Sequence, residues 1–211
     1  MTSFRFPSRL YTIADTLGRP ELSLIELTQK LCAGGARLLQ LRVKALPARE
    51  FLAVAQEVRA ICQRTGCLLI INDRADIALA VNADGVHVGQ EDLPLPAARK
   101  VLGPGKLIGV STHDPAQAIA AERGGADYIG FGPLFGTNTK ATGYSARGID
   151  QLREIRALVG LPIVAIGGVT AARAPSALAA GADAVAMISD LVLASDVTAK
   201  VREVLQAVKE P

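Results

Sequence analysis

Short apolar stretches recur along this chain, and each is followed by a segment whose apolar residues have helical spacing. We interpret eight of these stretches as strands, at residues 10–14, 38–43, 68–71, 85–88, 107–111, 128–132, 163–166 and 184–188. Alternating strands and helices are typical of a parallel sheet with crossover helices. Eight strand–helix units are the number that closes a (β/α)8 barrel.

An open, doubly wound sheet is the alternative fold. It normally has five or six strands and a glycine-rich dinucleotide turn after the first one. Here the first strand is followed by Asp15, Thr16 and Leu17. We therefore predict an α/β protein, a (β/α)8 TIM barrel, with one catalytic domain spanning residues 1–211.

A weak internal repeat precedes three of the predicted strands. Residues 34–37, 124–127 and 180–183 each combine Gly, Ala and a charged residue. Glycine commonly ends a helix and lets a short turn lead into the next strand. We interpret the repeat as architectural.

Composition and charge exclude several classes of protein. Only 4% of the residues are aromatic and none is Trp, which argues against a surface that stacks on bases. The net charge is +3 and opposite charges are interspersed, so no nucleic-acid footprint is evident. No apolar run approaches the roughly 20 residues of a membrane span. We expect a cytoplasmic protein without nucleic-acid or membrane partners.

The three cysteines, Cys32, Cys62 and Cys67, form no CxxC pair and have no histidine at metal-ligand spacing. Buried, reduced thiols are the expectation, and we assign them no chemistry.

The second predicted strand carries a candidate anion site. Alternation places Gln40, Arg42 and Lys44 on one side of it. A salt-bridged surface strand is the alternative, but a parallel central strand is covered on both faces. Three polar side chains on a covered strand favour a polyanion ligand.

Two carboxylates follow the third and fourth strands. Asp73 and Asp92 have no Cys or His cluster beside them, which favours a hard, oxygen-preferring cation such as Mg2+. Helix caps, or a surface pair of Asp73 with Arg74, are the alternatives. The position of Asp73 and Asp92 next to Arg42 and Lys44 favours the metal site over these alternatives.

Two later segments are suited to phosphate. Residues 132–140 form a loop of small and hydroxyl side chains that ends on Lys140, although such residues are also common in ordinary turns. Gly167 and Gly168 follow strand seven, and Ser189 follows strand eight, where many barrels bind a phosphate. The sequence thus predicts two anion sites, one of them assisted by metal.

Six segments resemble the thiamine phosphate synthase family in their order and spacing along nearly the whole chain. They are residues 40–44, 71–74, 85–92, 109–113, 132–140 and 166–168. The resemblance implies a transferase that joins hydroxymethylpyrimidine diphosphate to thiazole phosphate, giving thiamine phosphate and pyrophosphate. The family chemistry is dissociative, so no protein nucleophile is required. Val43 stands where an acidic residue is common, and Gly136 where Pro or Ala is common.

The resemblance also implies a set of ligand-binding residues. The pyrimidine diphosphate is held by Gln40, Leu41, Arg42, Val43, Lys44, Asn72, Ser111 and Lys140, the thiazole phosphate by Thr137, Asn138, Thr139, Gly168, Ile188 and Ser189, and one Mg2+ per subunit by Asp73 and Asp92. Among them Arg42, Lys44, Ser111 and Lys140 are the expected catalytic residues. Mn2+ in place of Mg2+ stays an alternative.

Two other functions compete with this interpretation. A thiazole tautomerase needs a histidine base and no metal, but Pro133 and Leu134 stand where that histidine is expected. A phosphate-binding barrel without catalysis is expected to lose Asp73, Asp92 or Lys140, and all three are present. His87 and His113 are interpreted as structural or substrate-lining residues. The sequence leaves the oligomeric state open and is compatible with a homo-oligomer.

Overall fold

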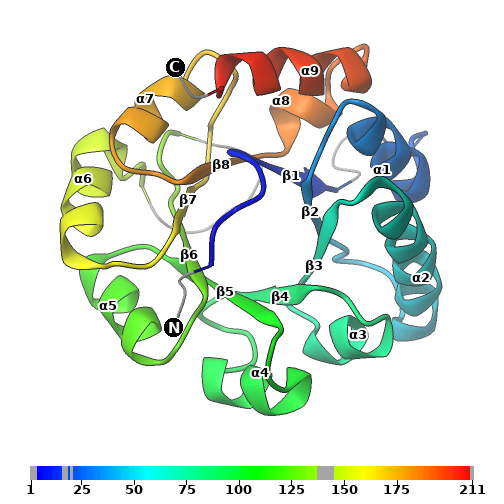
Figure 1. Cartoon of the computed structure of the whole chain (residues 1–211), viewed down its shortest axis with the longest axis horizontal. Coiled ribbons are helices and arrows are strands. Elements are labelled where there is room, and N and C mark those ends of the chain that lie inside the picture. Colours follow the sequence, from blue (N-terminus) through cyan, green and yellow to red (C-terminus); the bar gives the residue numbers. More distant parts are fainter. Residues whose placement is uncertain (1–3, 16–18, 20, 137–144, 210–211) are drawn as a thin grey trace.

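The structure, a computed structural model, describes residues 4–15, 19, 21–136 and 145–209. Within these residues eight parallel strands close into a barrel in the order β1 to β8, and helices surround it (Figure 1). The predicted (β/α)8 fold is therefore confirmed.

The strands are β1 (Leu10–Ala14), β2 (Leu38–Leu41), β3 (Leu68–Asn72), β4 (Gly85–Val88), β5 (Leu107–Thr112), β6 (Tyr128–Phe131), β7 (Ile163–Ala165) and β8 (Ala184–Met187). The helices are α1 (Leu24–Ala33), α2 (Ala48–Thr65), α3 (Ala75–Ala80), α4 (Leu95–Leu102), α5 (Pro115–Arg123), α6 (Gly148–Leu158), α7 (Ala174–Ala179), α8 (Ser189–Val192) and α9 (Val197–Ala207). All eight predicted strands are present, and their ends differ from the predicted ones by at most two residues. No helix within the described ranges has both the length and the apolar character to cross a membrane.

Alternation along the strands separates two apolar layers. Side chains such as Ile13, Leu38, Ile70 and Val164 fill the barrel interior. A larger set, including Leu41 of β2, packs between the strands and the helices. Both faces of each strand are thus buried, as a parallel sheet requires.

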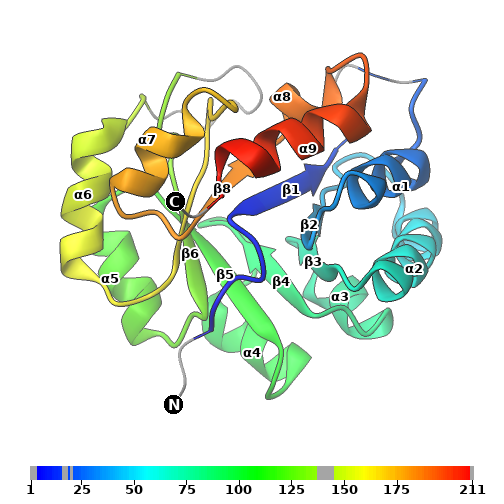
Figure 2. The ribbon, with the colours of Figure 1, turned by 45° about the horizontal axis from the view of Figure 1, so that its top comes forward.

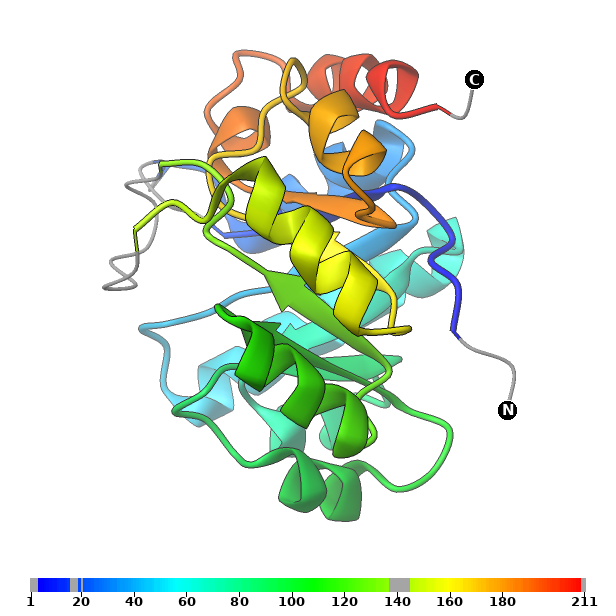
Figure 3. The ribbon, with the colours of Figure 1, turned by 90° about the vertical axis from the view of Figure 1, so that its left-hand side faces the viewer.

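Aromatic side chains cover the N-terminal mouth of the barrel. The segment before β1 crosses that mouth in dark blue (Figures 1 and 2). Phe4 and Phe6 pack edge to face, with ring centroids 5.0 Å apart, and Phe6 lies 5.3 Å from Tyr128 at the start of β6. In side view this segment and the end of α9 lie at the same end of the barrel (Figure 3). The opposite end is where the strands finish.

An aspartate lies directly before each of β4, β6 and β8. Its carboxylate binds the start of the strand one earlier in the chain, which is β3, β5 or β7. Each carboxylate accepts a backbone N–H of that strand at 2.8 Å and pairs with an arginine from the helix that precedes that strand in the chain. These three Asp clamps are Asp84 with Leu69 and Arg59, Asp127 with Ile108 and Arg99, and Asp183 with Ile163 and Arg156. Two of the aspartates end the repeated segments at residues 124–127 and 180–183, so the architectural interpretation of that repeat holds.

Candidate active site

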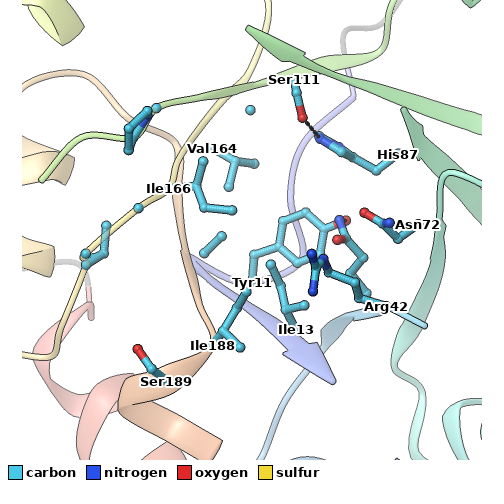
Figure 4. Close-up of a pocket in the computed structure, with 18 of the residues that line it drawn as sticks. Tyr11, Ile13, Arg42, Asn72, His87, Ser111, Val164, Ile166, Ile188 and Ser189 are labelled. Carbon is cyan, nitrogen blue, oxygen red and sulfur yellow. Dashed lines mark hydrogen bonds between the residues drawn. The ribbon is translucent and has the colours of Figure 1, made fainter. Parts of the chain in front are cut away.

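A cavity opens at the C-terminal ends of the strands. Seven of the predicted site residues line it: Gln40, Arg42, Asn72, Ser111, Gly168, Ile188 and Ser189. In Figure 4, Arg42 and Asn72 lie together on one side, and Val164, Ile166 and Ile188 lie across from them. The cavity therefore has a polar wall on β2 and β3 and a largely apolar wall on β7 and β8.

Arg42 is held by a carboxylate that the sequence analysis did not single out. Its guanidinium forms an ion pair with Asp15, and the two side chains are 14% and 11% exposed. Asp15 directly follows Ala14, the last residue of β1. Its position immediately after a buried strand could have identified Asp15 as a candidate site residue from the sequence. This pairing aims Arg42 into the cavity from β2.

Asn72 ends β3 and presents an amide to the cavity. The residue is 8% exposed, and its Nδ2 atom has no hydrogen-bond partner among the residues that the structure describes. A buried donor without an acceptor costs about 1–3 kcal/mol. An anionic ligand beside Arg42 would supply the acceptor.

Two carboxylates and a lysine lie next to this wall. Asp73 follows Asn72 with a left-handed φ of 63°, and its carboxylate forms an ion pair with Lys44. The Oδ2 atom of Asp92 accepts the backbone N–H of Gly89 at 2.7 Å. Burial, and then a hydrogen bond with Asp73, raise the pKa of the Asp92 carboxyl. Two crowded carboxylates of this kind fit a divalent cation.

Ser111 belongs to a chain of hydrogen bonds through the barrel interior. Nε2 of His87 is hydrogen-bonded to the Ser111 hydroxyl at 2.9 Å, and Nδ1 of His87 is hydrogen-bonded to the Tyr128 hydroxyl at 3.2 Å. Tyr128 in turn bonds to Tyr11 at 2.9 Å, and Tyr11 accepts from Gln40 at 3.1 Å. Burial raises the pKa of both tyrosines, so they stay neutral phenols. The chain joins two predicted ligand residues, Gln40 and Ser111, across the barrel.

Gly109 makes room for this chain. A Cβ atom there would lie 2.1 Å from the Tyr128 ring and 2.5 Å from Nδ1 of His87. His87 thus lies in a fitted position in the cavity wall, as the interpretation of a structural or lining residue expects. His113 also lines the cavity, and its Nδ1 contacts the Gly132 carbonyl.

The glycine turn after β7 forms another part of the wall. Gly168 has a φ of 64°, and a Cβ atom there would lie 2.5 Å from the Gly136 carbonyl oxygen. Only glycine fits both the conformation and the contact. Arg173 donates to the Gly168 carbonyl at 2.9 Å and stacks over Phe135 at 5.0 Å. The turn is therefore fixed against the loop that leaves β6.

The remaining predicted residues divide into two groups. Thr137, Asn138, Thr139 and Lys140 lie outside the described residues. The side chain of Leu41 lies in the core between strands and helices, and the partly buried side chain of Val43 packs against that core, so neither points into the cavity. Of the polar side chains predicted on one side of the second strand, Gln40 and Arg42 line the cavity. Lys44, whose side chain is 47% exposed, lies beside Asp73.

The fold and the site together define a (β/α)8-barrel enzyme with its polar side chains at the C-terminal ends of the strands. Within that class, the family model described as thiamine monophosphate synthase matches residues 10–191. The chain belongs to this family.

Relatives of similar length support the assignment. The thiamine-phosphate synthase of Moorella thermoacetica is 48% identical over 202 residues, covering 94% of this chain and 95% of its own. That of Methanospirillum hungatei is 46% identical over 194 residues, covering 92% and 94%. The solved thiamine phosphate pyrophosphorylase from Pyrococcus furiosus is 36% identical, with a TM-score of 0.86 and 95% of each chain covered.

Proposed function

We propose that this protein catalyses the thiamine-phosphate synthase reaction named for its relatives. Hydroxymethylpyrimidine diphosphate loses pyrophosphate as its methylene C–O bond breaks, and the electron pair leaves with the oxygen. The thiazole nitrogen then forms the new C–N bond to that methylene, giving thiamine phosphate. No side chain forms a covalent bond in this scheme.

The observation that carries the proposal is the buried Asn72 amide, which has no acceptor among the described residues and lies beside Arg42 in the cavity. A diphosphate placed there would accept from both groups. Lys44 and Lys140 add positive charge for the leaving group, and Ser111 adds a hydroxyl fixed by His87. Gln40 lies deeper, with its amide on Tyr11.

We also propose that Asp73 and Asp92 hold one Mg2+ per subunit. The proximity of Asp92 to Asp73 supports this, because a bound cation would relieve the repulsion between the two carboxylates. A bound Mg2+ supplies positive charge to phosphate oxygens. Lys44, which pairs with Asp73, is assigned to the same phosphate.

The thiazole phosphate is assigned to the opposite wall, at Gly168, Ile188 and Ser189, together with the loop residues Thr137, Asn138 and Thr139. The rigid glycine turn supports this assignment because its backbone is open to a ligand at a position where a Cβ cannot fit. In this arrangement the thiazole nitrogen approaches the pyrimidine methylene across the cavity. We place the reaction in the cytoplasm, in keeping with three free thiols.

The test is product formation from both substrates by the purified protein. We expect thiamine phosphate with Mg2+ and none with excess chelator. Asp92→Asn should lower kcat by about 100- to 1,000-fold, as loss of a charge-stabilising group does. Asp150→Asn, at a side chain that is 93% exposed, is the matched control and should keep full activity.

Full turnover in chelator would remove the metal from the proposal. Metal-independent isomerisation of the thiazole phosphate would favour a tautomerase instead. Tight binding of both substrates without product would favour a non-catalytic barrel.

A further inference from the structure

The three cysteines converge on one point of the fold, although nothing in their spacing predicts it. Cys32 lies in the last turn of α1, Cys62 in the last turn of α2, and Cys67 directly before β3. Their sulfur atoms all lie within 4.8 Å of one another. The residues are 9%, 0% and 3% exposed. All three are free thiols.

The spacing of the sulfurs is close to that of a metal site. A metal–thiolate bond of about 2.3 Å puts three sulfurs about 4 Å apart around one ion in a plane. The sulfurs would need to approach one another by less than about an ångström. The backbone N–H of Cys67 already donates to the Cys62 carbonyl at 2.9 Å, which fixes two of the ligands relative to each other.

Two arginines lie beside this cluster. Arg37 lies near Cys32, and its charge acts on that thiol. Arg59 lies one turn before Cys62, near enough for its charge to act on that thiol. The Nε atom of Arg59 is buried without a hydrogen-bond partner among the described residues. Arg59 is already paired with Asp84, so its charge is shared between that carboxylate and the cluster.

We propose that Cys32, Cys62 and Cys67 together bind one soft, thiophilic metal ion of the Cu+ class as three thiolates. Soft thiolate ligands select Cu+ and Zn2+, whereas Zn2+ in structural sites takes four ligands. Within the described residues the cluster contains three sulfurs and no histidine or carboxylate, which suits a three-coordinate monovalent ion. Binding releases the thiol protons to solvent and changes no oxidation state.

This site lies at the end of the barrel opposite the cavity. α1 and α2 end next to the starts of β2 and β3, where the Gly66 turn separates Cys62 from Cys67 (Figure 1). A bound ion would tie α1, α2 and the start of β3 together. Its expected effect is on stability, and the reaction at the C-terminal ends of the strands should be unchanged.

The experiment titrates the full-length, reduced protein with Cu+ under nitrogen. Native mass spectrometry and sulfur-to-copper charge-transfer absorbance should show one Cu+ per chain. At free Cu+ about 100-fold above Kd, Tm should rise by about 5–10 °C. Cys32→Ala should weaken binding at least tenfold. Met187→Leu, which removes a buried sulfur outside the cluster, is the matched control and should bind as the parent does.

A second readout remains informative if the cysteine variants do not fold. Alkylation of Cys32, Cys62 and Cys67 in the parent protein should slow together when one equivalent of Cu+ is present. No bound copper, unchanged alkylation, or equal binding by a folded Cys32→Ala variant would overturn the proposal. A mass loss of two hydrogens without metal would also overturn it, because the thiols would then form a disulfide.

The site is independent of the proposed function, and its failure can be told apart from failure of that function. Asp92→Asn should bind Cu+ normally while losing thiamine phosphate formation. The Cu+-loaded parent should keep full activity with Mg2+.

Discussion

At the scale of single residues, the cavity wall contains side chains whose polar atoms are fixed before any ligand arrives. Asp15 holds Arg42, and His87 holds Ser111. Asn72 differs, because its buried Nδ2 has no acceptor among the described residues. A residue that costs stability in the free protein is expected to regain that free energy on binding.

Asn72→Ala should therefore lower kcat/KM for the pyrimidine diphosphate by about 10- to 100-fold, the worth of one hydrogen bond to a charged group. The free energy of unfolding should stay the same or rise, because an unsatisfied buried amide is removed. Steady-state kinetics and urea denaturation measure the two effects. Asn82→Ala, at an amide that contacts Lys106 on the surface, is the control. Lower stability with unchanged kcat/KM would make Asn72 a structural residue.

At the scale of elements, the three Asp clamps explain how short strands keep their register. β7 has three residues, yet Asp183 fixes the N–H of its first residue and an arginine of α6 at once. Each Asp clamp joins two neighbouring strands to the helix that precedes the first of them. The strand–helix units are therefore fixed at their N-terminal ends, and the C-terminal loops are left to the site.

Asp84→Ala should lower the free energy of unfolding by about 1–3 kcal/mol, because a backbone N–H and Arg59 both lose a charged acceptor. Urea denaturation checks it. Asp150→Ala removes an exposed ion pair on α6 and should cost only about 0–0.5 kcal/mol. An equal effect in both variants would mean that the Asp84 contacts add nothing beyond a surface charge pair.

The elements also show what the sequence could and could not predict. Apolar runs predicted all eight strands because burial on both faces is a local property of each run. Alternation on β2 correctly brought Gln40 and Arg42 to one side. The pairing of Asp15 with Arg42 and the meeting of the cysteines depend on which distant segments become neighbours, and no local pattern records that. The same alternation turned Leu41 away from the cavity.

At the scale of the whole molecule, the two ends of the barrel differ: one is covered by aromatic side chains, and the other carries the cavity. Phe4 and Phe6 cover the N-terminal mouth over Tyr128, and the cavity opens at the other end.

Phe6→Ala should lower the free energy of unfolding by about 1–3 kcal/mol through lost apolar burial. KM for both substrates should not change. Thermal unfolding and steady-state kinetics test this, with the half-exposed Leu158→Ala as control. A large change in KM would mean that the mouth and the cavity are coupled.

Closure of the barrel joins the first strand to the last. Leu10 of β1 pairs with Val185 of β8, so this contact links residues 10 and 185. During synthesis β1 is made first and cannot gain its second neighbour until residues 184–187 have left the ribosome. Until then the growing sheet has two open edges, which are prone to pair with other chains. Translation that stalls before β8 would therefore leave an aggregation-prone, unclosed sheet.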